Sequence, residues 1–312
     1  MTNPLPTKVS HVLQTSYPVV RRYIDLPHYR LLLFAGLTFD HKSDLVLVNT
    51  LTRKVIFRKR LGSRIVTKIQ YCKDDDTVTV LTHVRSVLVF KIARGGMCQF
   101  DEFRHDKDVY DYDYVDGLRH VATCGDFPGI MIWDCNMNKQ VQCLTNYDAY
   151  PFRCVRFQKE KQWMVAGFLK GIIVFCYKSK EQLFKFDDFF RSYVNQIDYC
   201  PFSEDRFFAA DHVKTFYCFH IKNDGKLGQY ERIGPFETGI TSFTQVHHKG
   251  ISIVSEERRT RFLNMKENFT TVECRNPVMK LGGYLHYDHE RKKLLMACRI
   301  GSTSKIIIWR MH

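Results

Sequence analysis

The sequence predicts an all-β protein made of seven repeated units, each of four short antiparallel strands. A run of three or four apolar residues recurs along the 312 residues at intervals of 42 to 46 residues, and each run ends in an aromatic or large apolar residue. Apolar residues at helical spacing are nearly absent. These two observations indicate that the secondary structure of every unit consists of strands rather than helices.

The recurring run defines one anchor position in each unit. The runs occupy residues 45–48, 87–90, 130–133, 172–175, 216–219, 261–263 and 306–309. The last residues of these runs, the anchors, are Val48, Phe90, Trp133, Phe175, Phe219, Leu263 and Trp309. The six nearly equal intervals between the seven anchors argue against two sandwich domains, whose strands do not repeat at one spacing. An eighth unit would need about 40 more residues.

Other strand-like segments keep the same spacing. An apolar segment that ends in an aromatic residue precedes most runs, at Tyr71, Tyr114, Phe157, Tyr199 and Tyr287. A second run follows that segment, as at residues 78–81, 120–123 and 163–166. A polar turn and a fourth run follow the anchor, as at residues 54–57 and 140–143. Each unit is therefore predicted to contain four strands joined by turns.

Closure of the seven units into a ring would remove the exposed ends of the array. A single four-stranded sheet of this size cannot bury both faces, so neighbouring units must stack. The seventh unit lacks a fourth strand, because Trp309 lies three residues from the end of the sequence. We expect the N-terminal segment, about residues 8–17, to supply that strand and complete the seventh unit. Residues 1–312 would then form a single domain.

The unit with the sequence Ile-Met-Ile-Trp-Asp at residues 130–134, with Asp126 in the preceding turn, resembles the repeat of WD40-type seven-bladed β-propellers. The similarity covers nearly the whole chain, but the motifs diverge. The Trp-Asp dipeptide occurs in this copy alone, Trp309 is followed by Arg310, and the family's Gly-His dipeptide is not seen at the corresponding places. In most blades we expect apolar packing, favoured by 24 Phe residues, in place of the family's His–Ser/Thr–Asp–Trp hydrogen-bond network.

Basic residues gather at the two ends of the chain. The net charge is +14, of which residues 1–70 carry +9 and residues 249–312 carry +7, so the segment between them carries −2. A closed ring would join these ends into one basic sector, formed by units 6, 7 and 1. Two dense clusters lie in this sector, and their members are Arg58, Lys59, Arg60 and Arg64 in one and Arg258, Arg259 and Arg261 in the other.

By analogy with WD40-type proteins, the turns that carry both clusters lie on the same, narrower face of the ring. Arginine suits carboxylates and phosphates because its N–H donors form a fixed fork. The resemblance implies a non-catalytic scaffold or adaptor subunit of a multiprotein complex, and the clusters indicate an acidic or phosphorylated protein partner. RNA or DNA binding by the basic sector is the alternative, followed by phosphoinositide binding. A solvated basic surface without a ligand explains the clusters equally well.

Three further segments have both a functional and a structural interpretation. Phe189 and Phe190, at a junction between units, are candidate docking anchors if exposed, and inward packing of at least one is the alternative. Residues 108–114 alternate Asp with mostly Tyr, which predicts an inner strand lining the channel or, alternatively, an acidic site for a basic peptide. His247 and His248 have no nearby ligands at metal-binding spacing, so we expect surface histidines.

The sequence lacks the motifs of common catalytic sites. It contains no P-loop, no dinucleotide-binding glycine motif, no nucleophile elbow and no zinc-protease motif, so we expect neither enzymatic activity nor a cofactor or metal. No stretch of about 18 apolar residues is present, and no transmembrane segment is predicted. The 11 Cys residues form no Cys-x-x-Cys pair, which favours a reducing intracellular compartment, the cytoplasm or the nucleus.

Overall fold

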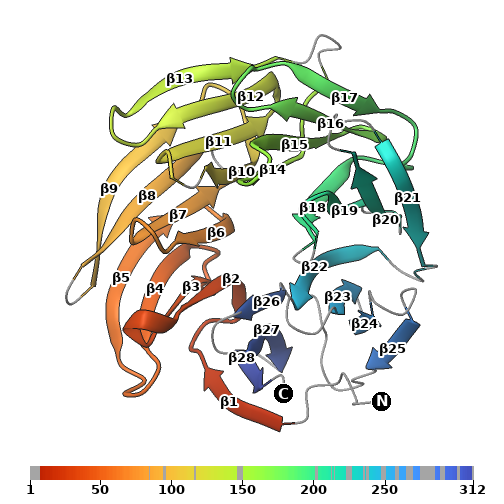
Figure 1. The fold of residues 1–312 in the computed structure, drawn as a ribbon. Coiled ribbons are helices and arrows are strands. Elements are labelled where there is room, and N and C mark those ends of the chain that lie inside the picture. The colour runs from red at the N-terminus through yellow and green to blue at the C-terminus, as the bar shows by residue number, and fades with distance from the viewer. Residues whose placement is uncertain are drawn as a thin grey trace. The chain divides into compact units, whose positions relative to one another are not determined.

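A computed structural model of the chain describes residues 8–83, 85–93, 96–115, 117–145, 150–200, 203–211, 213, 215–222, 227–234, 236, 239–246, 251–256, 260–264, 270–274, 285–288, 292–300 and 303–310. The strands form seven antiparallel sheets of four strands each, the blades of a seven-bladed β-propeller, which confirms the predicted fold class. Figure 1 shows these strands in chain order, from β1 in red to β28 in blue. Within the described residues, no helix is long and apolar enough to cross a membrane.

The chain divides into two compact units, and the first unit comprises residues 1–69, 94–96 and 237–312. Blade 1 contains β2 (Val19–Leu26), β3 (Leu31–Leu37), β4 (Ser43–Asn49) and β5 (Val55–Gly62), with the 3-10 helix η1 (Pro27–Tyr29) between its first two strands. Blade 6 contains β22 (Ile240–Val246), β23 (Ile251–Glu256), β24 (Thr260–Asn264) and β25 (Thr270–Cys274). Blade 7 contains β26 (Leu285–Asp288), β27 (Lys293–Ile300), β28 (Thr303–Arg310) and β1 (Lys8–Gln14).

The second unit, residues 70–93 and 97–236, holds most of blade 2 and all of blades 3 to 5. Blade 2 contains β6 (Val66–Cys72), β7 (Thr77–Thr82), β8 (Ser86–Ala93) and β9 (Gly96–Arg104). Blade 3 contains β10 (Val109–Val115), β11 (His120–Gly125), β12 (Phe127–Asp134) and β13 (Lys139–Leu144). Blade 4 contains β14 (Cys154–Gln158), β15 (Trp163–Phe168), β16 (Gly171–Cys176) and β17 (Gln182–Phe186). Blade 5 contains β18 (Val194–Tyr199), β19 (Arg206–Asp211), β20 (Phe216–Ile221) and β21 (Leu227–Ile233).

All seven anchors lie on the third strand of a blade, namely β4, β8, β12, β16, β20, β24 and β28. Third strands pair on both edges, and several of them are buried along nearly their whole length. A strand that is buried on both faces needs a continuous apolar run rather than alternation. This requirement explains why the third strand carries the strongest repeat in the sequence.

The N-terminal strand completes blade 7, as predicted. β1 pairs antiparallel with β28, from Lys8 opposite Arg310 to Gln14 opposite Lys305, with an irregularity between Val9 and His11. Figure 1 shows β1 beside β28 at this blade. The two ends of the chain are therefore joined by backbone hydrogen bonds within one sheet.

The segment that leads from β1 to β2 is fastened to β28 at Ser304. The Ser304 hydroxyl donates to the Pro18 carbonyl oxygen at 2.9 Å and accepts from the Val20 N–H at 3.2 Å. The Thr15 hydroxyl donates to the Ser304 carbonyl oxygen at 3.1 Å, and the Ser304 N–H donates to the Tyr17 carbonyl oxygen at 3.0 Å. These four hydrogen bonds, which we call the clasp, hold β28 of blade 7 against the segment that leads into β2 of blade 1.

Apolar contacts between adjacent blades form the core of each unit. In the first unit, Tyr23, Phe34 and Val46 of blade 1 pack with Leu295 and Ile306 of blade 7. The buried Tyr23 hydroxyl donates to the Leu295 carbonyl oxygen at 2.7 Å, so the phenol has a polar partner inside this contact. In the second unit, three clusters each contain residues of two successive blades. One includes Val89 and Val121, the next Ile132 and Phe175, and the third Val174 and Phe219.

Candidate functional site

The outer strand of blade 1, β5, carries the first predicted basic cluster. β5 pairs with β4 along one edge, and no other described strand pairs with it. Arg58 lies opposite Val46 and Arg60 lies opposite Asp44, so both arginines point to the same face of the sheet. Both side chains are exposed, whereas Lys59 and Arg64 are half-buried. Arg58 and Arg60 are therefore the two members of this cluster that face solvent most openly.

A buried carboxylate lies beside one of these arginines. The Arg60 Nε lies 3.7 Å from Asp44 Oδ1, with the Arg60 side chain 72% exposed and the Asp44 side chain 2% exposed. The Tyr17 hydroxyl donates to Asp44 Oδ2 at 2.9 Å. Burial, together with the hydrogen bond to Asp44, raises the pKa of Tyr17 to about 12, so the phenol stays protonated. Asp44 restrains Arg60 through its Nε, while most of the guanidinium remains accessible.

The second basic cluster contributes less to an exposed face than the sequence suggested. Arg258 and Arg259 lie outside the described residues. Arg261 lies on β24 opposite the fully buried Val254 and is itself only 8% exposed. Residues that face each other across a strand pair point to the same side, so Arg261 is directed inward with Val254. Arg261 is not part of a solvent-exposed cationic surface.

The two compact units differ strongly in charge. The first unit, which holds blades 1, 6 and 7, carries a net charge of +16, and the second carries −2. The basic N-terminal and C-terminal parts of the chain belong to the same unit because β1 pairs with β28. An anion that approaches β5 therefore meets a strongly positive unit, which favours association at low ionic strength.

The two phenylalanines between blades 4 and 5 pack inward. Phe190 is 3% exposed and belongs to the cluster between these blades. Phe189 is half-buried against the same cluster, with its ring centroid 4.9 Å from that of Tyr230 and 5.6 Å from that of Phe186. Their packing, rather than recognition of a partner, accounts for both aromatic rings.

The alternating Asp and Tyr residues of β10 form a link between inner strands. Asp111 Oδ2 accepts from the Val155 N–H at 3.1 Å and from Arg156 Nη1 at 2.9 Å. Asp113 Oδ2 accepts from the Phe157 N–H at 2.7 Å. Both carboxylates are buried, with exposed fractions of 8% and 6%. They satisfy backbone donors of β14, which leaves no open acidic site for a basic peptide.

The structure does not test the expectation that His247 and His248 are surface histidines, because both lie outside the described residues. Among the residues that are described, no group of three or more His, Cys, Asp or Glu side chains is arranged to hold a metal ion.

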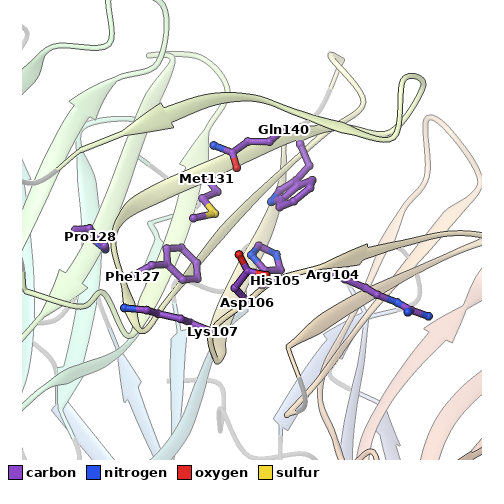
Figure 2. Close-up of a pocket in the computed structure, with 9 residues that line it drawn as sticks. Arg104, His105, Asp106, Lys107, Phe127, Pro128, Met131 and Gln140 are labelled. Atoms are coloured by element: carbon purple, nitrogen blue, oxygen red, sulfur yellow. The ribbon is translucent and has the colours of Figure 1, made fainter.

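A pocket between blades 2 and 3 was not anticipated from the sequence. It has a volume of about 220 Å³ and is formed by the connection from β9 to β10 and by strands β12 and β13. His105, Phe127, Met131, Trp133 and Gln140 line its wall (Figure 2). The side chain of Arg104 points away from the His105 ring in the same view. No periodic pattern marks this site, because its residues come from two blades.

His105 is the unusual group of this pocket. Its ring is stacked on Phe127 with centroids 5.5 Å apart and meets Trp133 edge-on at 4.8 Å. Both ring nitrogens are buried, and neither has a hydrogen-bond partner among the described residues. Burial lowers the pKa of His105 to about 4, so the ring is neutral at pH 7. Because both nitrogens are shielded from solvent, His105 acts as a packing residue here rather than as a general base or a metal ligand.

The Trp133 indole of the same blade has a polar partner as well as aromatic ones. Trp133 Nε1 donates to the Thr123 hydroxyl at 3.1 Å. The indole also stacks on Phe103 with centroids 5.4 Å apart. The His105 ring beside it makes aromatic contacts and, among the described residues, no hydrogen bond.

The comparisons with known proteins give no further guide to function. No protein-family model matches the chain, and no curated protein matches it either. The arguments for function therefore depend on the residues and their geometry.

Proposed function

We propose that this protein is a non-catalytic interaction scaffold, a divergent member of the WD40-type propellers, that binds an acidic or phosphorylated segment of a protein partner along β5. The observation that supports the proposal is the exposure of Arg58 and Arg60 on one face of an outer strand. Residues two apart on a strand are about 7 Å apart, which is also the spacing of alternate residues in an extended peptide. Two acidic residues at positions i and i+2 of such a peptide match the two guanidinium groups.

The binding energy of this surface would come from several small contributions. An exposed ion pair is worth about 1 kcal/mol or less, so two pairs alone give weak binding. Val55 and Ile56 at the start of β5 are 49% and 37% exposed and offer apolar contacts beside the arginines. The +16 charge of the first unit accelerates association with a negatively charged partner. The combination suits a reversible interaction within a larger assembly.

Nucleic acid is the less favoured ligand for the same surface. Sequence-independent binding of single strands combines cations with exposed aromatic rings on which bases stack. Of the three aromatic residues close to the cluster in the sequence, Tyr23 is buried, Phe57 is half-buried and Tyr29 is 37% exposed. A surface with aliphatic rather than aromatic neighbours favours a peptide.

The proposal is tested with a paired charge reversal. The probes are a fluorescein-labelled peptide of five Gly-Glu repeats, its Gly-phosphoserine counterpart and a 20-nucleotide single-stranded RNA, and fluorescence anisotropy reports their binding. Arg58→Glu combined with Arg60→Glu should weaken binding of both peptides by about 30-fold, as two lost ion pairs predict. Lys139→Glu with Lys178→Glu is the matched control, because it makes the same change in net charge at exposed residues of the second unit.

Three results would contradict the proposal. Equal loss of binding in both double variants would show that net charge, not β5, attracts the peptides. Undiminished binding in the Arg58/Arg60 variant would show that β5 is not the site. Tighter binding of the RNA than of either peptide, with a steep dependence on salt, would establish the nucleic-acid alternative instead.

A further inference from the structure

Arg153 lies in an aromatic setting that neither basic cluster shares. It precedes β14 of blade 4, and its guanidinium carbon lies 3.8 Å from the centroid of the Tyr110 ring and 4.6 Å from that of the Tyr193 ring. Tyr110 belongs to β10 of blade 3, and Tyr193 directly precedes β18 of blade 5. The Arg153 N–H donates to the Gly167 carbonyl oxygen at 2.7 Å, which holds the backbone in place. Three successive blades of the second unit therefore fix one arginine.

The guanidinium of Arg153 has no anionic partner in the part of the chain that the structure describes. No carboxylate of the described residues forms an ion pair with Arg153, and its Nε is buried without a hydrogen-bond partner. The residue as a whole is half-buried, and neither terminal nitrogen is among the buried atoms that lack a partner. Asp111, the carboxylate on the neighbouring inner strand, is already bound to Arg156 at 2.9 Å. A half-buried cation without a counter-charge is costly unless a ligand supplies one.

Other positive charges lie next to Tyr193. Lys170 donates its N–H to the Ser192 carbonyl oxygen at 3.0 Å, and Leu169 forms a bridge with Tyr193. The side chains of Lys170 and Arg191 are exposed, and neither forms an ion pair with a described carboxylate. The Arg191 N–H also donates to the buried carboxylate of Asp211 at 3.1 Å, so charges of both signs lie near Tyr193.

We infer that Tyr110, Arg153 and Tyr193 form a binding site for a carboxylate side chain, glutamate or aspartate, of a protein partner. Stacking on a ring occupies a face of the guanidinium and leaves its in-plane N–H donors free. A planar carboxylate accepts two of these donors at once while it lies in the same plane. A tetrahedral phosphate places oxygens above and below that plane, toward the tyrosine rings. This site lies in the second unit and does not depend on the role proposed for β5.

The test uses the full-length protein in which Arg58→Glu and Arg60→Glu have removed the contribution of β5. The probes are the labelled Gly-Glu peptide, a Gly-Gln peptide of equal length and the Gly-phosphoserine peptide, measured by fluorescence anisotropy. The Gly-Glu peptide should bind, and Arg153→Met should weaken it by at least tenfold. Arg153→Lys should lose most of the affinity, because an ammonium lacks the planar pair of donors. Lys178→Met, an exposed cation elsewhere in the same unit, should change binding by less than twofold.

A second measurement does not depend on any variant at Arg153. In the otherwise unmodified protein, the Nε–H resonance of Arg153 in a 15N-edited NMR spectrum should shift on addition of the Gly-Glu peptide and not on addition of the Gly-Gln peptide. Equal binding of the two peptides, an unchanged affinity in Arg153→Met, or a stationary Arg153 resonance would overturn the inference. Tighter binding of the phosphoserine peptide than of the Gly-Glu peptide at this site would overturn the assignment to a carboxylate.

Discussion

Mild acid should destabilise the protein through His105. The ring is 9% exposed, and burial lowers its pKa to about 4 from the value of 6.5 that an unfolded chain has. Above pH 6.5 the ring is neutral in both states and makes no contribution to the pH dependence. Between pH 6.5 and pH 4 the unfolded chain binds a proton that the folded protein does not bind, so stability falls as the pH falls. The gap between the two pKa values corresponds to about 3 kcal/mol once pH 4 is reached.

A neighbouring carboxylate opposes the effect of burial. Asp106, the next residue, favours the protonated ring and so raises the pKa of His105 against the effect of burial. Burial is the largest influence, so the sign of the effect does not change.

The assay is urea unfolding, followed by circular dichroism, at pH 7.0 and pH 4.5. His105→Phe is the comparison, because a phenyl ring can keep the stacking on Phe127 and Trp133 and does not titrate. Carboxylates titrate in both proteins, so their contribution cancels in the difference. The free energy of unfolding should fall by about 2–3 kcal/mol more in the unmodified protein than in the variant. An equal fall in both proteins would refute the reasoning.

Two further predictions concern the contacts that join blades. Asp113→Ala leaves the buried N–H of Phe157 without an acceptor and should cost about 1–3 kcal/mol of unfolding free energy, measured by urea unfolding. Asp113→Asn should recover part of this loss. Equal stability of all three proteins would show that the hydrogen bond between Asp113 and Phe157 does not stabilise the fold. Ser304→Ala removes the hydrogen bonds of the Ser304 hydroxyl with the Pro18 carbonyl oxygen and the Val20 N–H, and it should cost about 1–2 kcal/mol of unfolding free energy. Hydrogen exchange in β1 should become faster in that variant, and unchanged exchange there would show that the clasp does not hold the strand.

The repeat is the part of the fold that local patterns predict well. A third strand buried on both faces requires a continuous apolar run, and this requirement recurs in several blades regardless of what the neighbouring blades contain. Counting strands along the sequence also shows that blade 7 needs a fourth strand from elsewhere in the chain, and the N-terminal segment supplies it. Such features depend on strand period and chain order, which are both present in the linear sequence.

The candidate sites were predicted less completely, because exposure depends on which face of a strand a residue occupies. Arg58 and Arg261 belong to similar basic clusters, yet Arg58 projects from an outer strand and Arg261 shares a buried face with Val254. Asp111 and Asp113 alternate with tyrosine as channel-lining residues would, but their carboxylates bind donors of the next inner strand. A change of register by one residue would reverse each of these outcomes.

The linear sequence by itself determined the seven blades, the strand that closes the last blade and the concentration of positive charge at the two ends of the chain. Only the tertiary structure decided which of those charges reach solvent, and it brought Tyr110, Arg153 and Tyr193 together from three blades. The physical reason is that strand period and charge are local properties. The Arg153 guanidinium lies between two tyrosine rings that are each about one repeat away in the sequence. Only the packing of each blade against the next brings the three side chains together.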